Sequence, residues 1–155
     1  MPSIVYNAPR WRILLKEEGG ALCSLRCLEP DEAFPRDVTG PTPLLKEACH
    51  QLGAYFAGKL RRFDLPVVVN GTEFQRKVWN ALCRIDYGTV RSYGDIAREI
   101  GSPRAFRAVG MACGCNPVFL VIPCHRVVGA GGLGGFAYGL ELKKYLLDLE
   151  KGFLV

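Results

Sequence analysis

The chain has 155 residues, of which 49% are hydrophobic and 23% are charged. This composition is typical of a globular protein and excludes an intrinsically disordered chain, and the length suits one compact domain or two small ones. The 20 Lys and Arg residues outnumber the 15 Asp and Glu residues, which gives a net charge of +5. Such a modest basic excess permits a polyanionic partner without requiring one.

The seven cysteines argue against a secreted disulfide framework, because their number is odd and their spacing is irregular. We expect reduced thiols in a cytosolic-type compartment. The N-terminal segment lacks the basic region and apolar stretch of a signal peptide, and no apolar run approaches the roughly 18 residues that span a bilayer. These features predict a cytoplasmic protein with no membrane partner, or a nuclear one if the source is eukaryotic.

Residues 1–68 alternate short apolar runs with turn residues, which predicts a small α/β domain. Strand-like runs occupy residues 12–15, 20–28 and 65–69. Between them, apolar residues recur at three- and four-residue spacing over residues 44–60, the pattern of a helix with one apolar face. We therefore expect a small sheet with one helix.

Residues 69–155 have a helical pattern and predict a second, mostly α-helical domain. Thr72 with Gln75, and Ser92 with Asp95, form capping boxes that predict the starts of two helices. This half carries eleven basic and seven acidic side chains, a net charge of +4, so most of the chain's basic excess lies here.

A third helix is predicted next, with Ser102 as its N-cap and Pro103 at its first helical position, running over residues 104–113. It follows the second helix after a tight Gly-Ser turn, and the two form a helix-turn-helix candidate of a winged-helix-like kind. Arg104 and Arg107 on this helix suit a nucleic-acid groove. Two arginines on a solvated helix face are equally common, so charge and pattern alone favour neither interpretation.

A strand-like apolar run at residues 118–122 leads to a Pro-Cys-His sequence. The thiolate form of cysteine is a nucleophile, and the imidazole and guanidinium that follow Cys124 are groups that lower a thiol pKa. Because adjacent side chains usually diverge, we expect Cys124 and His125 to communicate through a water or a slight backbone distortion. Taken alone, these residues also fit a buried structural cysteine beside a surface histidine.

Several motifs follow one another in a fixed order between residues 74 and 150. They are Phe74…Val78-Trp79, Tyr87-Gly-Thr-Val-Arg-Ser-Tyr93, Arg107-Ala-Val-Gly, Asn116-Pro-Val, Ile122-Pro-Cys-His-Arg-Val and Gly139…Lys143…Leu146-Leu147. This set closely resembles the active-site region of the O6-alkylguanine-DNA alkyltransferases, also called methylated-DNA–protein-cysteine methyltransferases. Residues 1–68 resemble the family only loosely. The resemblance implies a single-turnover DNA-repair protein that acts on O6-alkylguanine in double-stranded DNA, and on O4-alkylthymine as a further candidate substrate.

The resemblance also implies catalytic roles for four residues. Cys124 matches the cysteine that accepts the alkyl group, and His125 matches the histidine that takes its proton through a water. Glu150 matches the carboxylate that orients this histidine, in a relay analogous to a hydrolytic triad. Asn116 matches the asparagine that supports the active-site loop, although a simple Asn-Pro turn explains it almost as well.

For DNA, Arg107 matches the arginine that fills the stack after the target nucleotide rotates out, and Tyr93 matches the tyrosine that presses on its 3′ phosphate. An alkyl group inside a duplex cannot reach a buried sulfur, so the base must be flipped. The resemblance places the second helix of the motif in the minor groove. Further DNA-binding candidates are Ser92, Arg104, Ala105 and Arg126.

The pocket for the base is expected from the backbone of Cys124 and Val127 and from the loop of residues 131–139, which contains Phe136, Ala137 and Tyr138. Phe136 would form an apolar wall. A bulky Tyr138 narrows the pocket in this interpretation, which predicts a preference for methyl over benzyl groups. Tyr93 or the Ala137 N–H is expected to assist the departing guanine oxygen.

The implied reaction needs no cofactor, and the protein is expected to act as a monomer without a metal. Two loose zinc-ligand sets are possible from residue types alone. They are Cys113, Cys115, Cys124 and His125, and Cys23, Cys27, Cys49 and His50. Two further functions also fit parts of the sequence: a non-enzymatic DNA-binding regulator, and a thiol hydrolase or redox enzyme.

Overall fold

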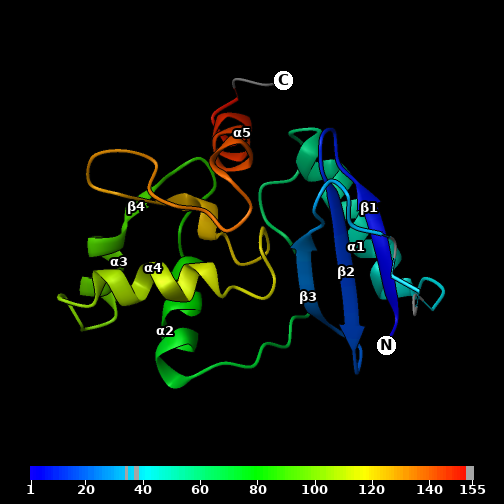
Figure 1. Cartoon of the computed structure of the whole chain (residues 1–155), viewed down its shortest axis with the longest axis horizontal. Coiled ribbons are helices and arrows are strands. Elements are labelled where there is room, and N and C mark those ends of the chain that lie inside the picture. The colour runs from blue at the N-terminus through cyan, green and yellow to red at the C-terminus, as the bar shows by residue number, and fades with distance from the viewer. Residues whose placement is uncertain (34, 37–38, 153–155) are drawn as a thin grey trace. The chain divides into compact units, whose positions relative to one another are not determined.

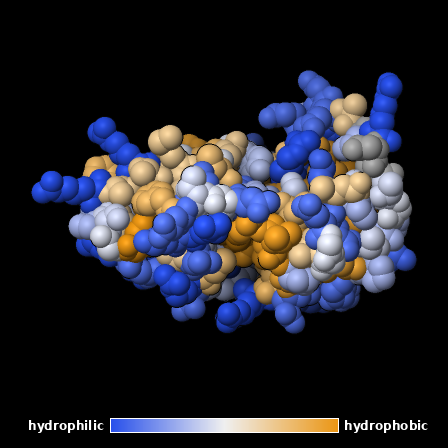
Figure 2. Space-filling model, turned by 90° about the horizontal axis from the view of Figure 1, so that it is seen from below, coloured by the Kyte–Doolittle hydropathy of each residue, from blue (hydrophilic) through white to orange (hydrophobic). Residues whose placement is uncertain are grey.

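In the computed structural model of the chain, residues 1–33, 35–36 and 39–152 are described (Figure 1). They form two compact units, Met1–Val69 and Asn70–Val155. No helix in this described part is both long and apolar enough to cross a membrane. Figure 2 shows one face of the molecule, where hydrophilic side chains project outward and apolar surface lies between them.

The first unit contains an antiparallel sheet with the strand order β1-β2-β3. Its strands are β1 (Ser3–Asn7), β2 (Arg12–Glu18) and β3 (Ala21–Cys27). Gly19 and Gly20 connect β2 to β3 with φ angles of 59° and 85°, the left-handed conformation that a two-residue type I′ hairpin turn requires. The short strand β1 was not expected from the sequence.

Helix α1 (Pro43–Phe56) packs against β1 and β2 (Figure 1). The Thr42 hydroxyl accepts a hydrogen bond from the Leu45 N–H and caps the helix. The helix was expected to continue to residue 60, but it ends earlier because Gly58 adopts a φ of 74°. The N–H groups of Gly58 and Lys59 bond back to the carbonyls of Tyr55 and Ala54, which forms a Schellman motif.

The predicted strand at residues 65–69 is absent from the described structure. This segment instead makes one isolated bridge, between Val67 and Leu22. The Leu22 N–H donates to the Pro66 carbonyl, and the Val68 N–H donates to the Leu22 carbonyl. Pro66 has no N–H, so it cannot donate to a regular ladder.

Both predicted capping boxes of the second unit are confirmed. Thr72 caps α2 (Glu73–Leu82) with the help of Gln75, and Ser92 caps α3 (Tyr93–Glu99) with the help of Asp95. In each case the N-cap hydroxyl accepts a hydrogen bond from the backbone N–H of the third helical residue. The side chain of that third residue accepts one from the backbone N–H of the N-cap.

Helix α4 (Phe106–Gly114) packs against α2 and α3 and completes the helix-turn-helix. The prediction that it begins near Ser102 and Pro103 is wrong. Residues 102–105 form a turn, in which the Ala105 N–H donates to the Ser102 carbonyl, and the helix has no side-chain cap. The indole Nε1 of Trp79 donates to the Ala112 carbonyl over 2.9 Å and connects α2 to α4.

The prediction of a strand at residues 118–122 is also wrong. This buried segment turns back on itself, with a bridge between Phe119 and Ile122, and Leu120 has a φ of 72°. It leads into a single 3-10 turn, η1 (Cys124–Arg126). The unit ends with α5 (Leu140–Glu150).

A short parallel pair formed by β4 (Arg91–Ser92) and β5 (Val127–Val128) lies beside the helix-turn-helix. The predicted fold class is confirmed: a small sheet with a helix comes first, and a mostly helical region with a helix-turn-helix follows.

The capping box of α2 gives a direct test of this fold. Thr72→Ala removes the acceptor of the Gln75 N–H, so we expect the free energy of unfolding to fall by about 1 kcal/mol in urea titrations. Thr72→Ser keeps the acceptor and should restore most of the loss. Equal stability of the alanine variant and the original protein would contradict the capping role.

Candidate active site

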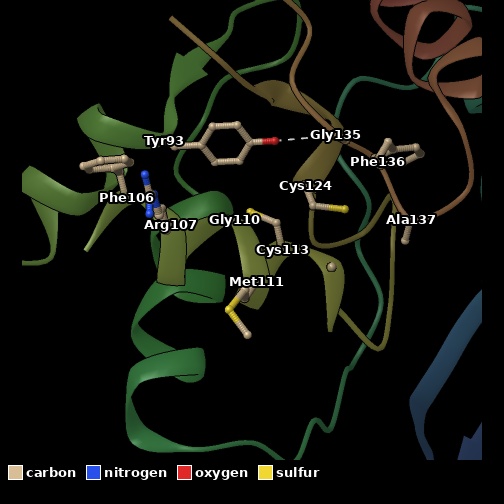
Figure 3. Close-up of a pocket in the computed structure, with 11 residues that line it drawn as sticks. Tyr93, Phe106, Arg107, Gly110, Met111, Cys113, Cys124, Gly135, Phe136 and Ala137 are labelled. Carbon is tan, nitrogen blue, oxygen red and sulfur yellow. Dashed lines mark hydrogen bonds between the residues drawn. The ribbon is translucent and has the colours of Figure 1, made fainter. Parts of the chain in front are cut away.

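Cys124 begins the η1 turn at the base of a pocket of about 460 Å³ (Figure 3). The residue is 6% exposed, and its N–H donates to the Ile122 carbonyl over 2.8 Å. Burial raises the pKa of the Cys124 thiol to about 11, although Asn116 and the charge of Lys143 act in the lowering direction. The thiol is therefore protonated at neutral pH and needs a base before it can react.

Asn116 holds the buried loop that precedes Cys124. Its Nδ2 donates to the Ile122 carbonyl over 2.7 Å, and its Oδ1 accepts from the Val118 N–H over 3.0 Å. These two bonds close a loop whose Leu120 has a left-handed φ, a conformation that is costly for a residue with a branched side chain. Asn116 thus does more than form an Asn-Pro turn, since it fixes the backbone that presents the thiol.

A buried group of three ionisable side chains lies behind Cys124. The Nε2 of His125 lies 2.6 Å from Oε2 of Glu150, and Arg126 donates to both oxygens of the same carboxylate over 2.8 and 3.1 Å. Arg126 also donates to the Ile85 carbonyl over 2.8 Å. Burial alone would raise the pKa of Glu150, but the hydrogen bonds and charges of His125 and Arg126 outweigh it and lower the pKa.

His125 is completely buried, and burial lowers its pKa despite the opposing effect of Glu150. A neutral imidazole beside an ionised carboxylate carries its proton on the nitrogen that faces the carboxylate. That nitrogen is Nε2, so Nδ1 presents a lone pair. Nδ1 has no hydrogen-bond partner among the described residues. The arrangement provides a base next in sequence to a thiol that needs one.

One face of α4 and the loop before α5 form the walls of the pocket. In Figure 3, Phe106 and Arg107 lie on one side of Cys124, and Phe136 and Ala137 lie on the other. Tyr93 lines the pocket as well, and its hydroxyl donates to the Gly135 carbonyl over 3.4 Å.

The loop is held in place by a buried lysine for which no role was expected from the sequence. The Nζ of Lys143 donates to the carbonyls of Val127 and Gly135 over 2.6 and 2.9 Å. Burial lowers the pKa of Lys143. Gly134 lies under the Tyr93 ring with a φ of 74°, and a Cβ there would come within 2.8 Å of that ring. A side chain at position 134 would therefore displace either the loop or Tyr93.

The structure brings most of the predicted site residues together. Cys124, Tyr93, Arg107, Phe136 and Ala137 line the pocket. The three other predicted catalytic residues lie behind the thiol or beside it: His125, Glu150 and Asn116. Among the remaining DNA candidates, Arg104 and Ala105 lie in the turn before α4, and Ser92 caps α3.

Three predicted placements are wrong. Arg126 cannot serve as a DNA contact, because it is buried and engaged with Glu150 and a backbone carbonyl. Val127 is fully buried and does not line the pocket. Tyr138 does not line it either, since its ring packs against Phe119 and Phe136 with centroids 4.8 and 5.9 Å away. The predicted narrowing of the pocket by Tyr138 therefore has no support in this geometry.

Neither candidate zinc site gathers a ligand set. Among the residues that the structure describes, no three His, Cys, Asp or Glu side chains are placed to hold one metal ion. Cys113 does share the pocket with Cys124, and burial raises the pKa of Cys113 to about 12.

One signal in the sequence could have revealed the role of Lys143. Lys143 and Glu150 lie seven residues apart, on the same helical stripe as Leu146 and Leu147, so two charges occupy a face that is otherwise apolar. A charged side chain on a buried face needs hydrogen-bond or ionic partners inside the protein. This pattern therefore predicts that both residues hold other segments in place or belong to the site.

Comparisons with known proteins define the family. Residues 2–69 match the model of the 6-O-methylguanine DNA methyltransferase ribonuclease-like domain, and residues 73–152 match the model of the DNA binding domain of the same proteins. Together these models cover nearly the whole chain. The chain belongs to the 6-O-methylguanine DNA methyltransferase family.

Individual relatives agree with this assignment. A methylated-DNA–protein-cysteine methyltransferase of Methanosarcina mazei is 43% identical over 97% of both chains. The protein of that name from Mycobacterium tuberculosis is 46% identical over 94% of this chain and 89% of its own. The crystal structure of Mycobacterium tuberculosis OGT in complex with DNA aligns with a TM-score of 0.88 at 42% identity, covering 99% of this chain and 94% of that one.

The buried arginine gives the first test of the site. Arg126→Met leaves the Glu150 carboxylate buried without its cation, so we expect the free energy of unfolding to fall by about 3–5 kcal/mol. Arg84→Met is the matched control, because Arg84 pairs with Glu99 at the surface of the same unit and should change stability by less than about 1 kcal/mol. Similar losses in the two variants, measured by urea unfolding, would contradict the burial argument.

Acidification gives the second test. Folding lowers the pKa of His125 below its ordinary value of 6.5 and that of Glu150 below 4.5, so the unfolded chain binds these protons more readily than the folded one. Their contribution to stability is full above these ordinary values and is lost as the pH falls. We expect urea midpoints to decline below about pH 6.5 and more steeply below about pH 4.5. In His125→Gln the decline between pH 7 and 5.5 should be weaker, and an unchanged slope would contradict the assignment.

Proposed function

We propose that this protein repairs DNA by moving an alkyl group from O6 of guanine in a DNA duplex to Sγ of Cys124. The observation that carries the proposal is the buried thiol at the base of a nucleotide-sized pocket, with a neutral His125 oriented by Glu150 behind it. The family membership and the relative described in complex with DNA support the same substrate class.

The chemistry begins with the proton of the thiol. His125 takes it at Nδ1 through a water, and the ionised Glu150 stabilises the imidazolium that forms. The thiolate then attacks the alkyl carbon, a new S–C bond forms, and the bond between this carbon and guanine O6 breaks with its electron pair on the oxygen. A proton from the site neutralises the guanine. Burial raises the pKa of Tyr93, so its hydroxyl stays protonated and can donate a hydrogen bond to the departing oxygen, while the proton held by His125 returns to the guanine.

The product explains why the protein acts once. A thioether has no acidic proton and is a poor leaving group, so Cys124 is consumed. The atoms balance without a cofactor, because the alkyl group passes to sulfur and the thiol proton replaces it on the base.

Reaching the pocket requires the target nucleotide to leave the duplex. The volume of about 460 Å³ falls within the range of pockets that enclose small ligands. We propose that α4 enters the minor groove, that Arg107 fills the space left in the stack, and that Tyr93 contacts the phosphate. In this scheme the second unit binds DNA and carries the chemistry, the first unit has a structural role, and the protein works as a cytoplasmic monomer.

Mass spectrometry after incubation with a duplex that contains O6-methylguanine tests the proposal. We expect a gain of about 14 Da, one CH₂, on the peptide that contains Cys124, and no gain in Cys124→Ala. Cys113→Ala is the matched control, because it removes the other thiol of the same pocket and should leave the transfer intact.

The outcomes separate the candidate functions. Binding of the modified duplex without any gain in mass would indicate a DNA-binding protein without chemistry. A gain that survives Cys124→Ala and disappears in Cys113→Ala would transfer the nucleophile role to Cys113.

A further inference from the structure

Two large apolar side chains are exposed on the same helix. Phe106 is 48% exposed and Met111 is 74% exposed, and both lie on α4. Isolated apolar side chains at a surface are ordinary. These two differ because both line the pocket that contains the reactive thiol.

The pattern along α4 separates two faces. Val109 and Ala112 are buried on one face, and the indole of Trp79 bonds to the backbone on that side. The opposite face carries every α4 residue that lines the pocket, at positions i, i+1, i+4, i+5, i+7 and i+8 from the first helical residue. These residues are Phe106, Arg107, Gly110, Met111, Cys113 and Gly114.

Phe106 is the first residue of α4 and lies next to Arg107 (Figure 3). In the view of Figure 3 its ring lies at the end of the pocket lining that is farthest from Phe136 and Ala137. An exposed aromatic ring that is next in sequence to Arg107 and two residues after Arg104 combines a stacking surface with attraction for a polyanion. Nucleic acid is the partner that uses both, since every base has an aromatic face and every nucleotide has a negative charge.

We propose that Phe106 is a DNA-stacking residue, whose ring contacts the base that flanks the extruded nucleotide. When a nucleotide leaves the duplex, the neighbouring base loses a stacking partner and exposes one of its faces. An aromatic ring on a helix in the minor groove can stack on such an exposed base face. This inference rests on the proposed function, and it assigns Phe106 to holding the DNA open rather than to the alkyl transfer itself.

Binding measurements in the Cys124→Ser background test the role, because no alkyl group is transferred there. The probe is a duplex with one O6-methylguanine. Phe106→Ala should weaken binding by about 5- to 150-fold, the range found when an aromatic residue that stacks on one base is truncated. Phe106→Trp should bind like the parent because it keeps an aromatic ring. Phe106→Leu keeps the apolar bulk but has no ring to stack on a base, so it should lose most of the affinity that Phe106 contributes. Leu140→Ala is the matched control: this residue is 49% exposed in the same unit but does not line the pocket.

Salt dependence distinguishes stacking from charge. Phe106→Ala should leave the slope of log K against log salt concentration unchanged, whereas Arg104→Ala should reduce its magnitude by about 1 if that arginine neutralises a phosphate. The fluorescence of 2-aminopurine at the flanking position should rise in the complex with Phe106→Ala relative to the parent, since the ring no longer quenches it by stacking. Thermal midpoints of all variants should match the parent.

Each result supports or overturns the stacking role. Parent-like affinity of Phe106→Ala, or full rescue by leucine, would overturn it. If either result is found while the protein without substitutions still accepts the methyl group from DNA on Cys124, only this inference fails. Absence of methyl transfer in the unmodified protein would instead contradict the proposed function.

Discussion

The rest of the site depends on the hydrogen bonds and ion pairs of the ionised Glu150 carboxylate. It lies near the end of α5, yet it binds His125 and Arg126 of the η1 turn, and the Gly88 N–H lies 3.3 Å from its Oε1. Arg126 extends the group to the Ile85 carbonyl. A carboxylate that is removed from water needs cations and hydrogen-bond donors around it. Separating these segments would leave the buried charge without its partners, which is strongly destabilising, so the carboxylate holds them together.

The same burial sets the reactivity of the site. It raises the pKa of Cys124 and lowers that of His125, so the resting pair is a neutral thiol and a neutral base. A thiol in this state is protected from incidental oxidation, because the thiolate is the reactive form. Asn116 and Lys143 act in the opposite direction on the pKa of Cys124, and both are fixed by hydrogen bonds to the backbone around the pocket.

Helix α4 connects this site to the surface. One face packs against α2 and α3, and the other lines the pocket, so the helix that is proposed to meet DNA is also a wall of the reaction chamber. The pocket's second wall is the loop whose Gly135 carbonyl accepts from Lys143 and Tyr93. Binding and chemistry are therefore built on one rigid support, which limits how far a bound base can move from the sulfur.

The sequence by itself determined the fold class, the two capping boxes and the family, because these depend on local spacing and on ordered motifs. It also identified Cys124, His125 and Glu150 as a set, through the resemblance.

Only the tertiary structure decided which side chains are buried and what they contact. Arg126 looked like a surface cation and is the partner of a buried carboxylate, Tyr138 packs on Phe119 outside the pocket, and Lys143 supports the site from within. The strand expected at residues 118–122 is a turn, because Asn116 and Ile122 bond across it. Local patterns cannot show such contacts, since the partners lie far apart in the chain and burial depends on how the whole unit packs.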